Sequence, residues 1–234
     1  MMLEKSEGFT AENAESAEKR PCEHVSHIRF IKVIQPGEML KISYTDITGL
    51  AILEPRVFED GRGFFFESYN SNVLAKHGIE LSFVQDNHAL SKRGVLRGLH
   101  YQVKQAQAKL IRVISGEVFD VAVDLRKSSP TFGQWFGLNL SAENRLQLYI
   151  PAHFAHGYLV LSETAEMLYK ASDFWAPQYE RCIRWDDPEL GIAWPLDGLP
   201  IVSEKDAKGV AFRDAELPAE DEADTFFAQQ GLRS

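Results

Sequence analysis

Residues 110–125 read LIRVISGEVFDVAVDL, which is two strand-like runs joined by a short turn. In the second run the side chains alternate with period two, one face being Phe119, Val121 and Val123 and the other Asp120, Ala122 and Asp124. The link Ser115-Gly116-Glu117 is interpreted as a tight connection between two strands. The stretch therefore predicts two neighbouring strands connected by a tight turn.

The sequence on both sides of this stretch has a similar strand-like pattern. Short apolar runs bounded by Gly, Pro, Asn or Asp recur from Leu40 onward, and long helical periods are scarce. Further strands are predicted at residues 47–58, 63–69, 81–89, 95–102, 135–140, 146–150, 157–161 and 165–171. One short helix is predicted at residues 70–77, with Asn70 or Ser71 as its cap and Gly78 at its end. Many short strands at close spacing predict an all-β sandwich or closed barrel with few helices.

The two ends of the chain have a different composition. The chain has 234 residues and 44% hydrophobic residues, which supports a sizeable core. Residues 1–39 lack a strong apolar period, and we expect them to form a disordered or loosely attached extension. An upstream choice of start codon is the alternative, since Met39 could begin a complete domain. Residues 40–234 are expected to form one domain that ends in a C-terminal tail.

Charge and cysteine content limit the classes of partner. The formal net charge of −9 argues against non-specific binding to nucleic acid or to an anionic membrane surface. No apolar run reaches the roughly 18 residues of a membrane span, and the N-terminus lacks the apolar core of a signal peptide. Cys22 and Cys182 lie far apart and are interpreted as reduced thiols, with a disulfide between them as the alternative, and two cysteines alone cannot form a zinc site. These features predict a cytoplasmic protein without nucleic-acid or membrane partners.

Two predicted strands carry candidate catalytic groups. In RGVLRGLHYQ, residues 93–102, Gly98 and His100 share a face, so a ligand could approach the imidazole closely. A lone histidine is more often a satisfied core residue, but Arg97, Gln102 and Lys109 crowd this one with polar groups. In AEMLYKASDFW, residues 165–175, Tyr169 taken alone is better interpreted as a core residue whose hydroxyl reaches solvent.

Three further segments are ambiguous when taken singly. In DGRGFFFES, residues 60–68, the glycines predict a turn rather than a nucleotide-binding loop, because no strand and helix flank them. In FVQDNH, residues 83–88, two amides on one face suit hydrogen bonds to hydroxyls or to a base, although polar filling of a barrel fits nearly as well. SEKDA, residues 203–207, alone predicts a solvated helix start.

Taken together and in order, these segments resemble the dTDP-4-dehydrorhamnose 3,5-epimerase family. The resemblance rests on EPRVFEDGRGFFFESYN, FVQDNHALSKRGVLRGLHYQ, KLIRVISGEVFDVAVDLRKSSPTFGQW, NLSAENRLQLYIPAHFAHGYLVLSE, AEMLYKASDFWAP and SEKDA, and it covers roughly residues 40–212. It implies a cupin-type double-stranded β-helix, that is, a jelly-roll barrel. It also implies a dTDP-sugar substrate, an isomerase that needs no cofactor, and a homodimer with a strand exchanged across the interface.

The resemblance also implies roles for individual residues. His100 matches the catalytic base, Asp206 its carboxylate partner, Tyr169 the general acid and Lys109 a lysine near the sugar carbonyl. Substrate-binding positions are matched by Arg62, Phe65, Glu67, Gln85, Asn87, Arg97, His156, Trp175, Glu180 and Lys205. Within that set, Phe65 is implied to lie near the nucleotide and Trp175 to stack on thymine. The loop from His100 to Lys109 is one residue shorter than in the family pattern.

Other readings of the same residues stay open. An epimerase acting only at C3 or only at C5 is one. A metal-dependent cupin using His100, His153 and His156 is another, but metal-binding cupins place two histidines as H-x-H where this chain has His100-Tyr101-Gln102. We therefore predict no metal. A non-catalytic sugar-nucleotide binding module is the third, and the intact acid–base set argues against it.

Overall fold

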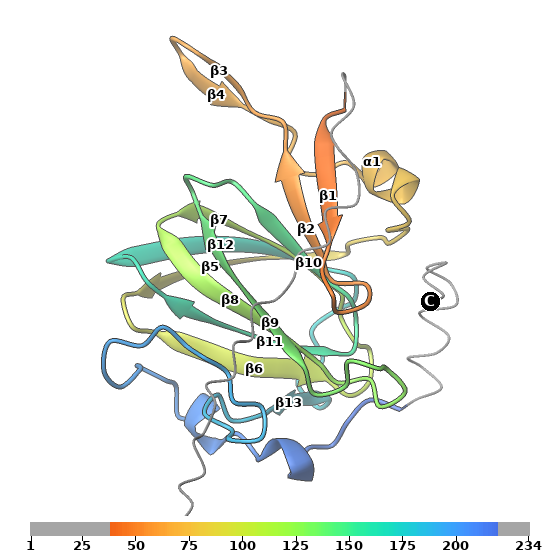
Figure 1. Cartoon of the computed structure of the whole chain (residues 1–234), viewed down its shortest axis with the longest axis vertical. Coiled ribbons are helices and arrows are strands. Elements are labelled where there is room, and N and C mark those ends of the chain that lie inside the picture. The colour runs from red at the N-terminus through yellow and green to blue at the C-terminus, as the bar shows by residue number, and fades with distance from the viewer. Residues whose placement is uncertain (1–37, 220–234) are drawn as a thin grey trace, which may run out of the picture.

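The computed structural model describes residues 38–219, which form two packed antiparallel sheets (Figure 1). One sheet has the order β1 (Leu40–Tyr44), β2 (Ala51–Pro55), β10 (Gln147–Ile150), β7 (Lys109–Ser115), β12 (Thr164–Ala171) and β5 (Gln85–Lys92). The other has the order β13 (Glu180–Cys182), β6 (Leu96–Gln102), β11 (Phe154–Val160), β8 (Glu117–Asp124) and β9 (Trp135–Ser141). The predicted all-β jelly-roll architecture is confirmed.

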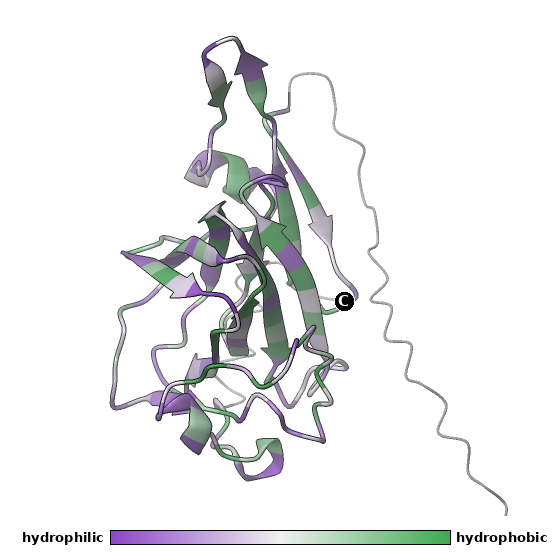
Figure 2. Cartoon of the chain, turned by 90° about the vertical axis from the view of Figure 1, so that its left-hand side faces the viewer, coloured by the Kyte–Doolittle hydropathy of each residue, from purple (hydrophilic) through white to green (hydrophobic). Residues whose placement is uncertain are grey.

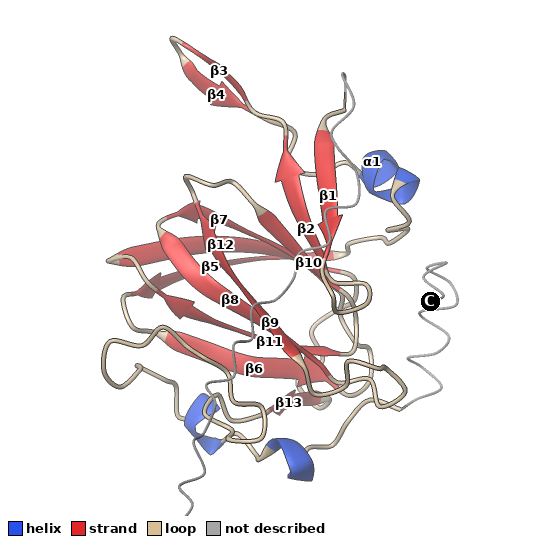
Figure 3. Ribbon diagram, in the orientation of Figure 1, coloured by secondary structure: helices blue, strands red, loops and turns tan. Residues whose placement is uncertain are grey.

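The remaining elements are small (Figure 3). A separate hairpin consists of β3 (Phe58–Asp60) and β4 (Gly63–Phe65), and it projects away from the sandwich (Figure 1). The helix α1 (Ser71–Lys76) begins at Asn70, whose side chain accepts hydrogen bonds from Asn72 N and Val73 N, as the predicted cap requires. Two 3-10 turns follow near the C-terminal end, η1 (Asp206–Lys208) and η2 (Phe212–Asp214).

Three apolar clusters hold these layers together. The main cluster lies between the two sheets and includes Ile111, Phe136 and Met167. A second cluster lies on the outer face of the five-stranded sheet, where Leu190 and Phe212 from the C-terminal segment cover it, and a third packs α1 against the six-stranded sheet. Apolar residues accordingly follow the strands, while many connecting turns are hydrophilic (Figure 2).

The predicted tight connection joins β7 and β8 at Gly116, but the two strands lie in different sheets and do not pair with each other. Gly116 has φ +74°, and a Cβ there would lie 2.0 Å from the Thr164 carbonyl oxygen, so this turn requires glycine. The alternation predicted for β8 is present, but both faces are buried. One face packs into the interior, and the other is covered by the C-terminal segment, which the local pattern did not indicate.

Some predicted boundaries are wrong. Residues 47–58 are not one strand, because residues 46–49 form a turn and β2 ends at Pro55, which has no backbone N–H to continue a ladder. The prediction for 81–89 begins too early, since β5 starts at Gln85, and β1 and β13 were not predicted. Residues 1–37 and 220–234, which hold most of the predicted extension and the end of the tail, lie outside the described residues. No helix among residues 38–219 is long and apolar enough to cross a membrane.

Candidate active site

A cavity of about 340 Å³ opens at one end of the sandwich, between the two sheets. Its walls come from β5, β6, β7, β11 and β12, and from the segment that leads into β13. Sequence-predicted site residues in this lining are Gln85, Asn87, Arg97, His100, Lys109, His156, Tyr169, Trp175 and Glu180. One chain therefore gathers residues that are spread over almost a hundred sequence positions.

His100 lies on β6 and is partly exposed to the cavity. Its Nε2 is 2.5 Å from Oδ1 of Asp206, a buried carboxylate in η1. Burial alone would raise the pKa of Asp206, but hydrogen bonds from His100, Ser203 and the Gly98 backbone lower it below its ordinary value. A carboxylate that stays ionised beside one ring nitrogen fixes the tautomer, so the other nitrogen is free to act as a base.

A bulge in β6 places Arg97 beside His100. The register with β11 pairs His100 with His156 but Arg97 with Tyr158, so β6 contains one residue more than β11 over this interval. Two residues three positions apart consequently line the same cavity, which strict period-two alternation would not allow. The strands approach closely here, because a Cβ on Gly98 would lie 2.6 Å from Gly157 Cα.

Tyr169 faces the cavity from β12 of the other sheet. It pairs in register with Asn87 on β5 and Ile111 on β7. Burial raises the pKa of Tyr169 above its ordinary value, and the neighbouring Tyr158 adds to this effect while Arg97 opposes it. The phenol is therefore protonated at neutral pH and can donate a proton. An imidazole and a phenol thus line one cavity from opposite sheets.

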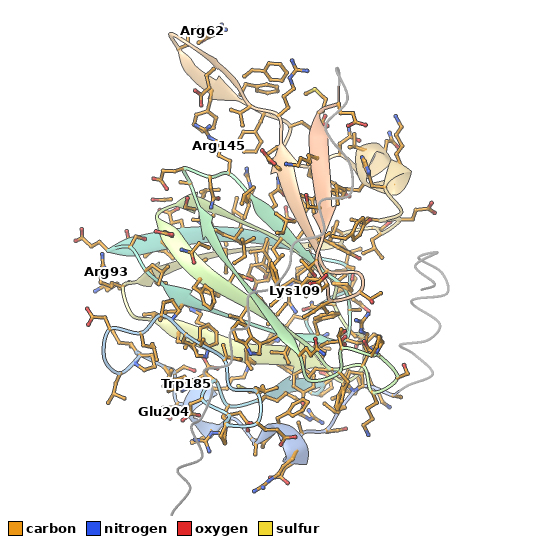
Figure 4. All side chains as sticks on the ribbon, viewed as in Figure 1. Arg62, Arg93, Lys109, Arg145, Trp185 and Glu204 are labelled. Atoms are coloured by element: carbon orange, nitrogen blue, oxygen red, sulfur yellow. The ribbon has the colours of Figure 1, made fainter. Side chains whose placement is uncertain are left out.

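Lys109 begins β7 and is buried in the cavity wall, where Figure 4 labels it inside the sandwich. Burial lowers its pKa from 10.5 to about 8, although the carboxylates of Glu180 and Asp120 oppose the shift. Its ammonium is the charged form below that value, so the cavity contains a cation that can stabilise a developing negative charge.

A second histidine–carboxylate pair lies deeper in the same wall. His156 Nε2 is 2.9 Å from Oδ2 and 3.0 Å from Oδ1 of Asp120, which is fully buried on β8. Asp120 was not predicted as a site residue. A signal was present, because an aspartate in the middle of an otherwise apolar strand needs a buried partner.

The mouth of the cavity is formed by the segment after β12. Trp175 is 56% exposed, and its indole N–H donates to Glu180 Oε2 at 3.2 Å. The same carboxylate oxygen is 2.6 Å from Lys205 Nζ, so Lys205 joins the site through Glu180 although it is outside the cavity lining. An exposed aromatic face beside a cavity suits a planar base.

The comparisons with known proteins agree with this geometry. The family model for dTDP-4-dehydrorhamnose 3,5-epimerase matches residues 44–214. The chain belongs to this epimerase family. The dTDP-4-dehydrorhamnose 3,5-epimerase of Pseudomonas aeruginosa is 62% identical over 178 residues, which are 76% of this chain and 98% of that protein.

Two solved structures extend the family comparison. One is the Legionella pneumophila dTDP-6-deoxy-D-glucose-3,5-epimerase in complex with dTDP-4-keto-L-rhamnose, which is 48% identical to this chain and has a TM-score of 0.75. The alignment covers 76% of this chain and 97% of that one. The other is a 3′-monoepimerase from Streptomyces bikiniensis in complex with dTDP-quinovose, which is 34% identical and has a TM-score of 0.74. This alignment covers 80% of this chain and 97% of that one. Epimerases with one and with two target carbons therefore share this fold.

Three positions matched to the family pattern do not reach the cavity of their own chain. Arg62 is at the turn of the β3–β4 hairpin and Phe65 is at the end of β4, 68% exposed, while Glu67 follows it and accepts a hydrogen bond from Asn70. Figure 4 shows Arg62 at the tip, where it pairs with Asp60. The hairpin extends away from the sandwich, so these side chains cannot contact a ligand beside His100 of the same chain.

The histidines of the metal-dependent alternative do not form a ligand group. Among residues 38–219, the only three His, Cys, Asp or Glu side chains within ligand reach of one another are His100, Cys182 and Asp206, and His153 is not among the residues that line the cavity. Burial, together with the Asp206 carboxylate, raises the pKa of the Cys182 thiol to about 12. The thiol in this structure is therefore protonated at neutral pH.

Proposed function

We propose that this member of the family converts dTDP-4-keto-6-deoxy-D-glucose to dTDP-4-keto-L-rhamnose by inverting C3 and C5. The observation that carries the proposal is the placement of His100 and Tyr169 on opposite sheets around one cavity. Epimerisation needs a base on one side of the sugar ring and an acid on the other, and this cavity offers both. The 62% identity to the Pseudomonas aeruginosa enzyme supports the choice of substrate.

His100 is the proposed base. The protons at C3 and C5 are acidic because both carbons are adjacent to the C4 ketone, and a neutral imidazole is a suitable base near pH 7. Asp206, 2.5 Å from Nε2, would hold the ring orientation and stabilise the imidazolium that forms when the proton is taken.

Lys109 is proposed to stabilise the enolate. Proton removal at either carbon places negative charge on the C4 oxygen, and an ammonium in a buried wall stabilises that charge more strongly than one in water. His156, held by Asp120, lines the same wall and would bind the sugar beside it.

Tyr169 is proposed to return the proton from the opposite face. Inversion results only if the new C–H bond forms on the side opposite to His100, and a protonated phenol on β12 meets that demand. Only protons move in this reaction, so the chemistry requires no nicotinamide and no other cofactor.

The nucleotide is proposed to bind at the mouth of the cavity. Trp175 would stack on thymine, and Arg97 and Lys205 would neutralise the diphosphate. Gln85, Asn87 and Glu180 would bind the hydroxyls and the base through hydrogen bonds. We also propose that the enzyme acts in dTDP-rhamnose biosynthesis in the cytoplasm, which agrees with the free thiol of Cys182.

A homodimer is proposed to complete the site. Phe58, Phe64 and Phe65 are exposed on a hairpin that leaves its own sandwich, and a cluster of exposed aromatic residues is typical of a protein–protein contact. We propose that this hairpin reaches a second copy of the chain and brings Arg62, Phe65 and Glu67 to the nucleotide bound there.

Proton NMR in heavy water tests the proposed function. The wild-type protein is incubated with dTDP-4-keto-6-deoxy-D-glucose, and deuterium is followed at each sugar carbon. We expect deuterium at both C3 and C5 and formation of dTDP-4-keto-L-rhamnose. Exchange at one carbon only would indicate a monoepimerase, and no exchange would refute the proposal.

A further inference from the structure

The segment between β12 and β13 carries the exposed aromatic pair Phe174 and Trp175, and glutamine side chains hold its backbone. Residues 173–176 belong to no strand or helix. Gln107 Nε2 donates to the Asp173 carbonyl at 2.8 Å, and Gln102 Nε2 donates to the Phe174 carbonyl at 3.3 Å. The next two N–H groups bind glutamine oxygens, Trp175 N to Gln85 Oε1 at 2.9 Å and Ala176 N to Gln102 Oε1 at 2.7 Å. Each of the residues 173–176 thus has a backbone hydrogen bond to a glutamine side chain.

Gln102 is the centre of this arrangement. Its side chain is 5% exposed, and it contacts the aromatic segment on both sides of Trp175. It also donates to the Gln105 carbonyl at 2.6 Å, which ties the loop between β6 and β7 to the same point. Both amide N–H donors are therefore used by backbone carbonyls, so Gln102 has no donor left for a ligand.

Fixing this segment has a direct consequence for ligand binding. Trp175 and Phe174 are 56% and 59% exposed, so little side-chain packing holds their rings in place. A loop that orders only when a ligand arrives loses affinity through the entropy of ordering. Backbone groups that are already bound to buried amides avoid that cost, because the segment is ordered before the base arrives.

We propose that Gln102 is a positioning residue for nucleobase recognition, acting by holding the Phe174–Trp175 platform at the mouth of the cavity. The inference rests on the proposed function in one respect, namely that the ligand carries a planar base which stacks on Trp175. Gln102 makes no contact with the reacting carbons in this account, so it affects binding and leaves the proton transfers unchanged.

The test is a double-mutant cycle on the full-length protein, with dTDP as the probe in calorimetry. Gln102→Met keeps the length of the side chain and removes all three hydrogen bonds, and we expect the Kd for dTDP to rise about tenfold. Trp175→Ala should have a similar effect. In the Trp175→Ala background, Gln102→Met should add less than about twofold, because the platform it holds is already gone.

Steady-state kinetics provides a second test of the positioning role of Gln102. With the keto-sugar substrate, Gln102→Met should raise KM about tenfold and leave kcat within about threefold. Gln107→Met removes a single bond to the same segment and should give a smaller rise in KM. Ser162→Ala is the matched control, because it removes side-chain bonds to Glu117 and Thr164 at the opposite end of β12 and should leave the Kd for dTDP unchanged.

The outcomes separate this inference from the proposed function. Wild-type Kd for dTDP in Gln102→Met, or losses that simply add to those of Trp175→Ala, would overturn the positioning role. An equal loss of kcat would also overturn it. Failure of the wild-type protein to bind dTDP at all would instead refute the proposed function.

Discussion

The cavity and the β3–β4 hairpin both carry residues of the family pattern, but the side chains in the two regions differ in what holds them in place. In the cavity, side chains from different strands hold one another, as His100 is held by Asp206 and His156 by Asp120. On the hairpin, Arg62 pairs with Asp60 of its own turn and with no other side chain of residues 38–219, and Phe65 faces solvent. The proposed acid–base groups are thus assembled within one chain, whereas the hairpin side chains are proposed to act on a second copy of the chain.

The difference predicts two classes of mutational effect. Substitutions of His100, Lys109 or Tyr169 in the cavity should lower kcat, because they remove groups that are proposed to act on the keto-sugar. Substitutions on the hairpin should raise KM, because they would remove the proposed contacts to the nucleotide of a neighbouring chain. The following experiments test this division between effects on kcat and effects on KM.

Removing the base should have the largest effect. His100→Ala should lower kcat about 10³-fold, within the usual range for a general base. Asp206→Asn should have a comparable effect, and the double variant should be little worse because the pair acts as a unit. Asp186→Asn, which alters an exposed carboxylate paired with Arg184, is the control and should be nearly silent. A near-normal kcat for His100→Ala would show that another group is the base.

Lys109→Met should lower kcat about 10²-fold to 10³-fold, as expected for loss of an oxyanion-stabilising group. The wild-type rate should also depend on pH through this residue. Its pKa is lowered to about 8, so the ammonium is present below that pH and is lost as the pH rises through it, and kcat should fall there. Lys109→Arg should remove that alkaline decline. Lys92→Met, on an exposed residue at the far end of β5, should change neither quantity.

Substitutions on the hairpin should have the smallest effect on activity. Mixed dimers then show whether the hairpin acts in its own chain or in its partner. Arg62→Ala combined with Phe65→Ala should raise KM about tenfold and change kcat little. Co-expression of this variant with His100→Ala, using two affinity tags, yields mixed dimers. One cavity of each mixed dimer then has an intact His100 and receives an intact hairpin from its partner, so wild-type KM should return. A mixed dimer that keeps the high KM would show that the hairpin acts within its own chain.

Local patterns predicted much of the fold. The alternation in β8, the turn at Gly116 and the Asn70 cap follow from nearest neighbours in sequence, and each is present. The residues of the cavity could be listed from the family resemblance. Their arrangement on two facing sheets followed from the jelly-roll architecture that the resemblance implied.

The remaining features depend on contacts between distant segments. The bulge in β6 that brings Arg97 beside His100 results from close approach to Gly157, about sixty positions away. Burial of the outer face of β8 requires the C-terminal segment, and β13 exists only as a partner for β6. Asp120 was overlooked because its partner His156 lies on another strand. The apolar neighbours of Asp120 indicated that it needs a buried partner, but the identity of that partner, like the other contacts, cannot be predicted from a short window of sequence.

The proposed mechanism requires an imidazole and a phenol that act on opposite faces of one sugar ring, and Tyr169→Phe in heavy water tests this requirement most directly. With His100 intact, the variant should still exchange deuterium into the substrate at C3 or C5 while product formation falls by a much larger factor. His100→Ala should lose both exchange and product. If Tyr169→Phe retains full inversion, or loses exchange as completely as His100→Ala, the assignment of two opposed groups is contradicted.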